Sequence, residues 1–326
     1  MLPKPCAGQS EFKGNYDMTL WWIFFAVFIL VMLTLDLAVF SRRAHAVKIK
    51  ESLYWTSFWI VLALFFCAGV YFFYGHLKAL EFLTGYLIEY SLSIDNLFVF
   101  LLFFRYFFVP AEYEQKALIW GIIIALIMRG IFIFAGIALI NKFHWVIYIF
   151  GTFLIFTAIQ IARGKEQEVH PERNVMIKLL RMLMPVTHEY SGNRFFAIIE
   201  HKRFATPLLA VVLVLGTTDV FFAVDSIPAV LAVTTDPFIV YTSNVFAVLG
   251  LRSLFFAISG LMKLFHYLQY GLAVILGFVG IKMLITDLYK INIGVSLAVI
   301  ASVITLSIIA SLAWPKKEPQ IISEEK

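Results

Sequence analysis

The sequence consists of runs of mostly apolar residues, separated by short charged segments. An α-helix needs about 20 such residues to cross the hydrocarbon core of a bilayer. A helix also satisfies its own backbone hydrogen bonds, which the bilayer core requires. Only 14% of the 326 residues are Asp, Glu, Lys or Arg, too few to cover a soluble domain of this size. The pattern therefore predicts an all-α polytopic membrane protein, in contact with membrane lipid over most of its surface.

Nine transmembrane helices are predicted, at residues 18–40, 53–75, 80–104, 117–140, 143–162, 206–232, 237–262, 267–287 and 292–314. The one long polar connection, 163–205, is predicted to hold a short amphipathic helix at 175–183. The loops after the odd-numbered spans, together with the C-terminal tail, hold 18 of the 26 Lys and Arg residues, against 5 on the other side. Because basic residues favour the cytoplasm, we expect a multi-pass protein of the cell (inner) membrane with its N-terminus outside and its C-terminus in the cytoplasm.

Two other classes of function are disfavoured. Basic residues do not form a stripe interleaved with exposed aromatic residues, so nucleic-acid binding is not expected. The two cysteines, Cys6 and Cys67, lie in the N-terminal tail and in an apolar run, which argues against a disulfide and a thiolate metal site.

An internal repeat is visible in the polar residues of the spans. Residues 89–96 and 219–226 share one pattern: an acid, five residues, an Asp, and then a small polar residue. The next span carries one arginine in each case, Arg129 and Arg252, and 156–160 resembles 278–282. These matches predict two three-helix units, 80–162 and 206–287, separated by a cytoplasmic loop at 163–205. An odd number of helices per unit forces the copies into opposite orientations, so we expect a six-helix core of inverted repeats, as in many secondary transporters.

The charged residues inside the spans are candidates for function, because a carboxylate at mid-bilayer costs about 2.5–3.5 kcal/mol. The acids and bases in question are Asp36, Glu89, Asp95, Asp219 and Asp225, and Arg129, Arg252 and Lys282. One explanation is that the acids only pair with the bases to hold helices together. Five acids nevertheless outnumber three bases, so at least two carboxylates remain to bind a cation or a proton.

Helical geometry restricts how each pair of acids can act. Six residues of a straight helix separate two side chains by about 120° and about 9 Å, so one straight helix cannot aim both at one point. Either the two acids have different roles, or the helix is broken, for which Gly216 and Pro228 in the sixth span would be suitable. We expect Asp95 and Asp225 at the centre, with Glu89 and Asp219 nearer an arginine or accepting protons.

The predicted ligands are all oxygen atoms, which suits Mn²⁺, Ca²⁺ or Mg²⁺ and disfavours copper and thiolate-bound zinc. The histidines lie in or beside loops and are interpreted as solvated. The predicted metal ligands are Glu89, Asp95, Asn96, Asp219, Asp225, Ser226 and Asn244. The residues predicted to transfer protons or to support these ligands are Asp36, Arg129, Arg252 and Lys282.

The sequence resembles a known family, the TerC/Alx integral membrane proteins. The resemblance rests on 89–96, 226–240, 242–244 and 249–252, with Asp36 and His45 in the first span and loop, and it extends over about 36–290. It implies a role in manganese homeostasis, with relatives linked to tellurium resistance. It also implies Mn²⁺ efflux from the cytoplasm, with Glu89, Asp95, Asp219 and Asp225 as the core acids.

Three functions remain open on the sequence. The first is a secondary transporter that exports Mn²⁺, with Ca²⁺ as another candidate ion, in exchange for protons. The second is a non-transporting scaffold that binds metal and recruits membrane partner proteins or further copies of itself, for metallation of exported enzymes or for tellurite stress. The third, an intramembrane enzyme, has only the paired aspartates of aspartic proteolysis in its favour. The sequence lacks the motifs Gly-x-Ser-x-Gly and His-Glu-x-x-His and a Gly-rich phosphate loop, so no enzyme is expected.

Overall fold

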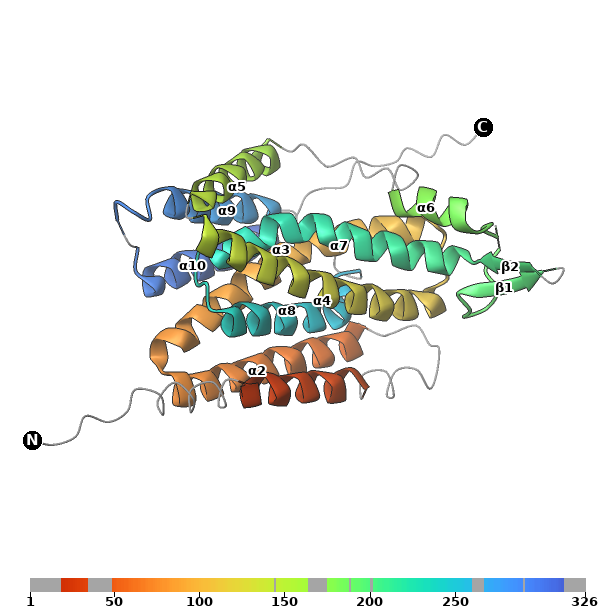
Figure 1. The fold of residues 1–326 in the computed structure, drawn as a ribbon, viewed down its shortest axis with the longest axis horizontal. Coiled ribbons are helices and arrows are strands. Elements are labelled where there is room, and N and C mark those ends of the chain that lie inside the picture. Colours follow the sequence, from red (N-terminus) through yellow and green to blue (C-terminus); the bar gives the residue numbers. More distant parts are fainter. Residues whose placement is uncertain are drawn as a thin grey trace, which may run out of the picture. The chain divides into compact units, whose positions relative to one another are not determined.

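The structure is a computed structural model that describes residues 19–34, 49–143, 145–163, 175–187, 189–199, 202–259, 267–289 and 291–313. The chain forms two compact units, Met1–His45 and Ala46–Lys326. In the first unit the described part is one apolar helix, Thr19–Thr34. The described part of the second unit consists of helices and one small β-hairpin (Figure 1).

The elements of the second unit are α2 (Ile49–Tyr74), α3 (His76–Tyr106), α4 (Ala111–Lys142), α5 (Val146–Ala162), α6 (Val175–Leu183), β1 (Phe196–Ile199), β2 (Lys202–Ala205), α7 (Pro207–Leu231), α8 (Pro237–Ser259), α9 (Leu268–Leu284) and α10 (Ile293–Ala313). Among the described residues, α2, α3, α4, α7, α8 and α10 are long and apolar enough to cross a membrane. The other three predicted spans coincide with shorter apolar helices. The expected all-α polytopic membrane fold is therefore confirmed.

The helices pack in pairs that relate the two predicted repeat units. Helix α3 packs against α8 as α7 packs against α4, and α5 packs against α9. Helices α3 and α7 also meet, as do α4 and α8. Exchanging α3, α4 and α5 with α7, α8 and α9 leaves this set of pairs unchanged. Helix α2 packs on α3 and α8, and α10 packs on α3 and α9, so both lie outside the six. The limits of the repeats, 80–162 and 206–287, stay a prediction.

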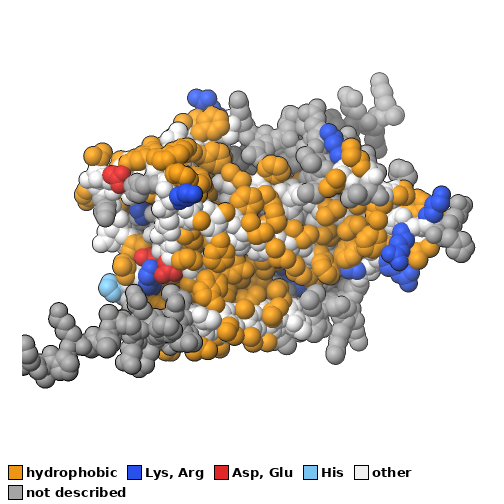
Figure 2. Space-filling view, in the orientation of Figure 1, with side chains coloured by type: hydrophobic (Ala, Val, Ile, Leu, Met, Phe, Trp, Pro, Cys, Tyr) orange, Lys and Arg blue, Asp and Glu red, His pale blue; other side chains and the backbone are white. Residues whose placement is uncertain are grey.

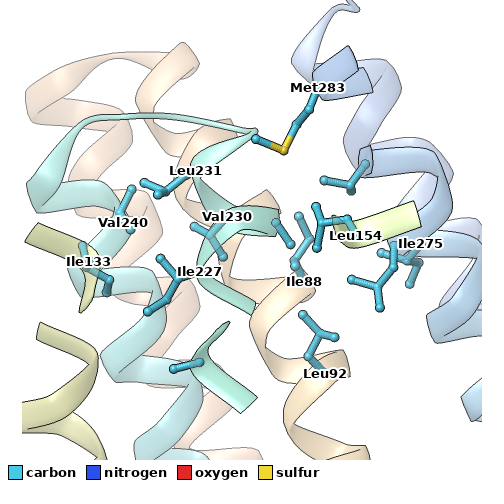
Figure 3. Packing of buried hydrophobic residues seen from close by; sticks show 14 of the residues in the cluster. Ile88, Leu92, Ile133, Leu154, Ile227, Val230, Leu231, Val240, Ile275 and Met283 are labelled. Carbon is cyan, nitrogen blue, oxygen red and sulfur yellow. The ribbon is translucent and has the colours of Figure 1, made fainter. Parts of the chain in front are cut away.

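A cluster of buried apolar side chains lies between the helices of the two predicted repeat units. Its members come from α3, α4, α5, α7, α8, α9 and α10. Figure 3 shows part of it, with Ile133 of α4, Ile227 of α7, Ile88 of α3 and Ile275 of α9 lying between the helices. Lipid tails are as apolar as these side chains, so the cluster stabilises the fold through close packing rather than through the hydrophobic effect.

The outer faces of the helices carry large apolar side chains. On the face shown in Figure 2, apolar side chains cover the middle, and charged side chains lie mostly near the helix ends. Phe72 of α2 and Phe221 of α7, for example, are 80% and 69% exposed. Exposed apolar surface of this extent marks contact with lipid.

The turns at one end of the core are short and are joined by ion pairs and a hydrogen bond. Gly75 alone joins α2 to α3, with a φ of +90° that residues with a side chain rarely adopt. In the first turn of α3, the Lys78 ammonium lies 2.9 Å from the carboxylates of both Glu81 and Asp236. The hydroxyl of Thr234 donates a hydrogen bond to Glu81 at 2.7 Å. The turn before α8 is thereby held against the start of α3.

Helix α6 forms at the residues where the amphipathic helix was predicted, whereas the hairpin of β1 and β2 was not predicted. The segment before the hairpin is held against α3 and α4. The Tyr190 hydroxyl donates to the carbonyl of Phe107 at 2.8 Å, and the Lys116 ammonium donates to the carbonyl of Asn193. The same ammonium lies 4.4 Å from the ring centre of Phe195. Burial raises the pKa of Tyr190 to about 12, so this phenol stays a neutral donor at physiological pH.

Replacing Gly280 by alanine is expected to destabilise the contact between α5 and α9. A Cβ atom at Gly280 would lie 2.8 Å from the carbonyl oxygen of Gly151 and 2.8 Å from Cγ1 of Ile155, so the two backbones would have to separate. Overpacking of this kind costs about 1–3 kcal/mol, which thermal unfolding in detergent would detect. Gly69→Ala in α2 is the matched control, since its added Cβ meets nothing within 4 Å. Equal melting temperatures for the two variants would contradict the prediction.

Candidate functional site

Arg129 of α4 lies at the centre of a buried polar cluster. Its guanidinium contacts Glu89 of α3, from the first predicted repeat unit, and Asp219 of α7, from the second. The side chains of Arg129, Glu89 and Asp219 are 1%, 0% and 4% exposed. Asn244 of α8 and Ser93 of α3 complete the cluster. Four helices therefore bring five polar side chains together inside the helical core.

The carboxylates of Glu89 and Asp219 accept all but one of the hydrogen bonds described in this cluster. Arg129 donates from Nε and from Nη2 to the two oxygens of Asp219, both at 2.8 Å, which is a bidentate pair. Its Nη1 donates to Oε1 of Glu89 and, at 3.3 Å, to Oδ1 of Asn244. Asn244 Nδ2 donates to the second oxygen of Glu89 at 2.9 Å, and the Ser93 hydroxyl donates to the first at 3.3 Å.

The charges of this cluster do not balance. With both carboxylates ionised, Glu89 and Asp219 carry two negative charges and Arg129 carries one positive charge. An uncompensated charge is costly in a buried site, and more so in a membrane. The cluster therefore favours the approach of one further cation. Pairing with Arg129 is the environment expected for Glu89 and Asp219.

Asp225 has a different environment from Asp219, although both lie on α7. Helix α7 is continuous from Pro207 to Leu231, so the break suggested by Gly216 and Pro228 does not occur. A continuous helix turns the two acids away from each other. Asp225 is partly buried and accepts a hydrogen bond from the Thr157 hydroxyl of α5 at 3.3 Å. Within the described ranges no basic side chain lies within ion-pair distance of Asp225.

The other predicted ligands differ in their burial and in their hydrogen-bond partners. Asn244 of α8 is hydrogen-bonded to Glu89. Asn96 of α3 is 7% exposed and Ser226 of α7 is 1% exposed. The hydroxyl of Ser226 has no hydrogen-bond partner among the residues that the structure describes. Asp95 lies in α3, but its side chain is outside the described part of the structure.

The remaining predicted residues lie outside the Arg129 cluster or outside the described residues. Arg252 is buried in α8, at 3% exposure. Lys282 is partly buried in α9, and among the described side chains no carboxylate pairs with it. Asp36 falls outside the described residues. In the described part of the chain no three His, Cys, Asp or Glu side chains form a ready metal site. A cation would therefore need amide, hydroxyl or backbone oxygens as well as carboxylates.

Two residues of the site were not predicted from the sequence. Ser93 follows Glu89 by four residues and so lies on the same face of α3; helical spacing could have identified it. Thr157 lies in a different helix from Asp225, 68 residues earlier in the chain. No local pattern marks it, because only the packing of α5 against α7 brings the two together.

Comparison with known proteins identifies the family. Residues 74–319 match the family described as integral membrane protein TerC. A membrane protein of Myxococcus xanthus is 48% identical over 298 residues, covering 91% of this chain and 93% of its own. Proteins provisionally named membrane-bound redox modulator Alx are 45% identical in Salmonella typhi (88% of this chain, 92% of the relative) and 44% identical in Escherichia coli K12 (90% and 94%). No solved structure matches. The chain belongs to the TerC family of integral membrane proteins, as its resemblance to TerC and Alx proteins implied.

Proposed function

We propose that this chain is a secondary transporter that exports divalent metal cations, Mn²⁺ first among them, from the cytoplasm across the cell (inner) membrane. Transport would take place through the six-helix core, with the N-terminus outside and the C-terminus in the cytoplasm. The chain would not act as an enzyme. Ca²⁺ is the other cation that oxygen ligands would accept readily.

The observation that carries the proposal is the charge of the Arg129 cluster, which with both carboxylates ionised holds two acids and one base. Glu89 and Asp219 share one arginine, and Asp225 has no basic partner among the described residues. Carboxylates at membrane depth face a partner, a cavity or an ion. Their position at the junction of two repeat units is also where secondary transporters place their substrates. Exchange for protons is a natural coupling, because a carboxylate released by the metal can accept a proton.

The name of the Alx relatives suggests another role, that of a redox modulator. A dithiol mechanism would need both cysteines of this sequence, Cys6 and Cys67. Cys67 is a free, partly buried thiol of α2, and Cys6 lies outside the described residues. The buried carboxylates have no part in such a mechanism. We therefore favour metal transport, with a metal-binding scaffold for stress responses or for metallation of exported proteins as the alternative.

A flux assay with the purified full chain in liposomes separates these functions. We expect Mn²⁺ uptake above the leak of protein-free liposomes, and slower uptake of Ca²⁺ and Mg²⁺. A proton gradient that drives protons out of the liposomes should make Mn²⁺ uptake faster. Metal binding without flux would favour the scaffold. Neither binding nor flux of any of the three cations would contradict a metal function altogether.

A further inference from the structure

The guanidinium of Arg129 lies where a bridging cation would lie, between a carboxylate of each repeat unit. We propose that Arg129 is an exchangeable counter-cation, so that its guanidinium and the transported divalent cation are alternative occupants of the position between Glu89 and Asp219. The inference rests on the proposed function. It adds that the resting protein holds its own cation in the site, and that the metal must displace it.

Geometry supports an exchange rather than simultaneous binding. Arg129 engages both oxygens of Asp219 and one oxygen of Glu89, and Asn244 engages the other oxygen of Glu89. Each carboxylate oxygen therefore already accepts a hydrogen bond in the buried cluster. A metal ion that lies between the two carboxylates would compete with the guanidinium for that position, because the guanidinium is the donor that these two acids share.

Charge leads to the same conclusion. With Arg129 in place, the ionised cluster carries one net negative charge, so a divalent cation would leave one net positive charge buried. With the guanidinium withdrawn, the two carboxylates carry two negative charges, which one divalent cation neutralises. Buried sites strongly disfavour uncompensated charge.

An exchange would also change the contact between the repeat units. Arg129 lies on α4 and Asp219 on α7, and these two helices pack against each other. Loss of the bidentate pair would remove this polar link between α4 and α7, while the metal would link α3 to α7. Arg129 is thus a positioning residue whose place depends on whether the metal is bound.

The test is equilibrium binding of Mn²⁺ alone to the purified full chain in detergent, followed by the loss of the electron paramagnetic resonance signal of free Mn²⁺. If the guanidinium-free state is a minor population of the wild-type protein, Arg129→Gln should tighten Mn²⁺ binding about tenfold or more. Arg129→Lys keeps the charge but cannot hold both carboxylates as a fork does, and should tighten binding less. Lys142→Gln is the matched control, since it removes one positive charge from the exposed end of the same helix.

The outcomes separate this proposal from the proposed function. Tighter binding in Arg129→Gln, lost again in Arg129→Gln/Asp219→Asn, supports the exchange. If Arg129→Gln does not survive purification, Arg129→Lys decides, because a purely structural arginine predicts equal or weaker binding there. Mn²⁺ transport by the wild-type protein with no tightening in the Arg129 variants overturns the exchange alone. Absence of both Mn²⁺ binding and flux in the wild-type protein contradicts the proposed function instead.

Discussion

Arg129→Met is expected to lower the free energy of unfolding by about 3–5 kcal/mol in metal-free buffer, because removal of one partner leaves buried charge uncompensated. We expect the loss to lie at the upper end of this range, since Glu89 and Asp219 would face each other with no shared base. Unfolding by SDS in mixed micelles with EDTA, followed by tryptophan fluorescence, would measure it. Each single carboxylate variant should cost less, because Glu89→Gln or Asp219→Asn leaves Arg129 with one balanced partner.

The electrostatic origin of this loss can be separated from a loss of packing. Glu89→Gln/Arg129→Met/Asp219→Asn removes all three charges, and it should recover most of the stability lost in Arg129→Met. Lys142→Met controls for loss of a positive charge on α4 outside the buried cluster and should change stability little. Addition of Mn²⁺ should stabilise Arg129→Met more than the wild-type protein, because a ligand that binds only the folded state adds stability by mass action. A triple variant as unstable as Arg129→Met would show that the cause is packing.

The spans and the different settings of Asp219 and Asp225 could be predicted because each rests on a local physical rule. A run of about 20 apolar residues has one stable form in a bilayer, and the apolar helices of the structure lie at the predicted places. The six-residue spacing within α7 showed that Asp219 and Asp225 cannot share one point unless the helix breaks, and the helix is continuous. Helical rotation then accounts for their different partners.

The partners themselves could not be predicted, because they depend on how helices pack. Counting charges left open which acids Arg129 would neutralise, and the structure shows that it contacts one from each repeat unit. The hydrogen bond of Asn244 to Glu89 could not be predicted either, since the position of Asn244 on α8 relative to α3 is set by tertiary packing. The hairpin was missed for another reason: its strands have four residues each and little apolar alternation.

Asp225→Asn is expected to reduce Mn²⁺ flux into liposomes about a hundredfold or more, while the protein still inserts and elutes as the wild type does. The substitution keeps the shape of the side chain and removes its charge. Loss of a charged ligand from a buried site costs about 3 kcal/mol or more, which corresponds to a factor of at least about a hundred. Initial rates of Mn²⁺ uptake at equal protein density in the bilayer would measure the effect.

Two further variants show whether the carboxylate or its setting matters. Thr157→Val removes the hydroxyl that bonds to Asp225 and keeps the shape of the side chain, so flux should fall only about threefold to tenfold. Asp287→Asn makes the same chemical change in the exposed turn after α9, where an amide oxygen can still accept the hydrogen bond of the Tyr148 hydroxyl, and should leave flux unaltered. A wild-type rate in Asp225→Asn would mean that this acid lies in the membrane without contacting the ion. The Arg129 cluster alone would then have to carry the transported charge, and the two acids of α7 would differ in function as they differ in partners.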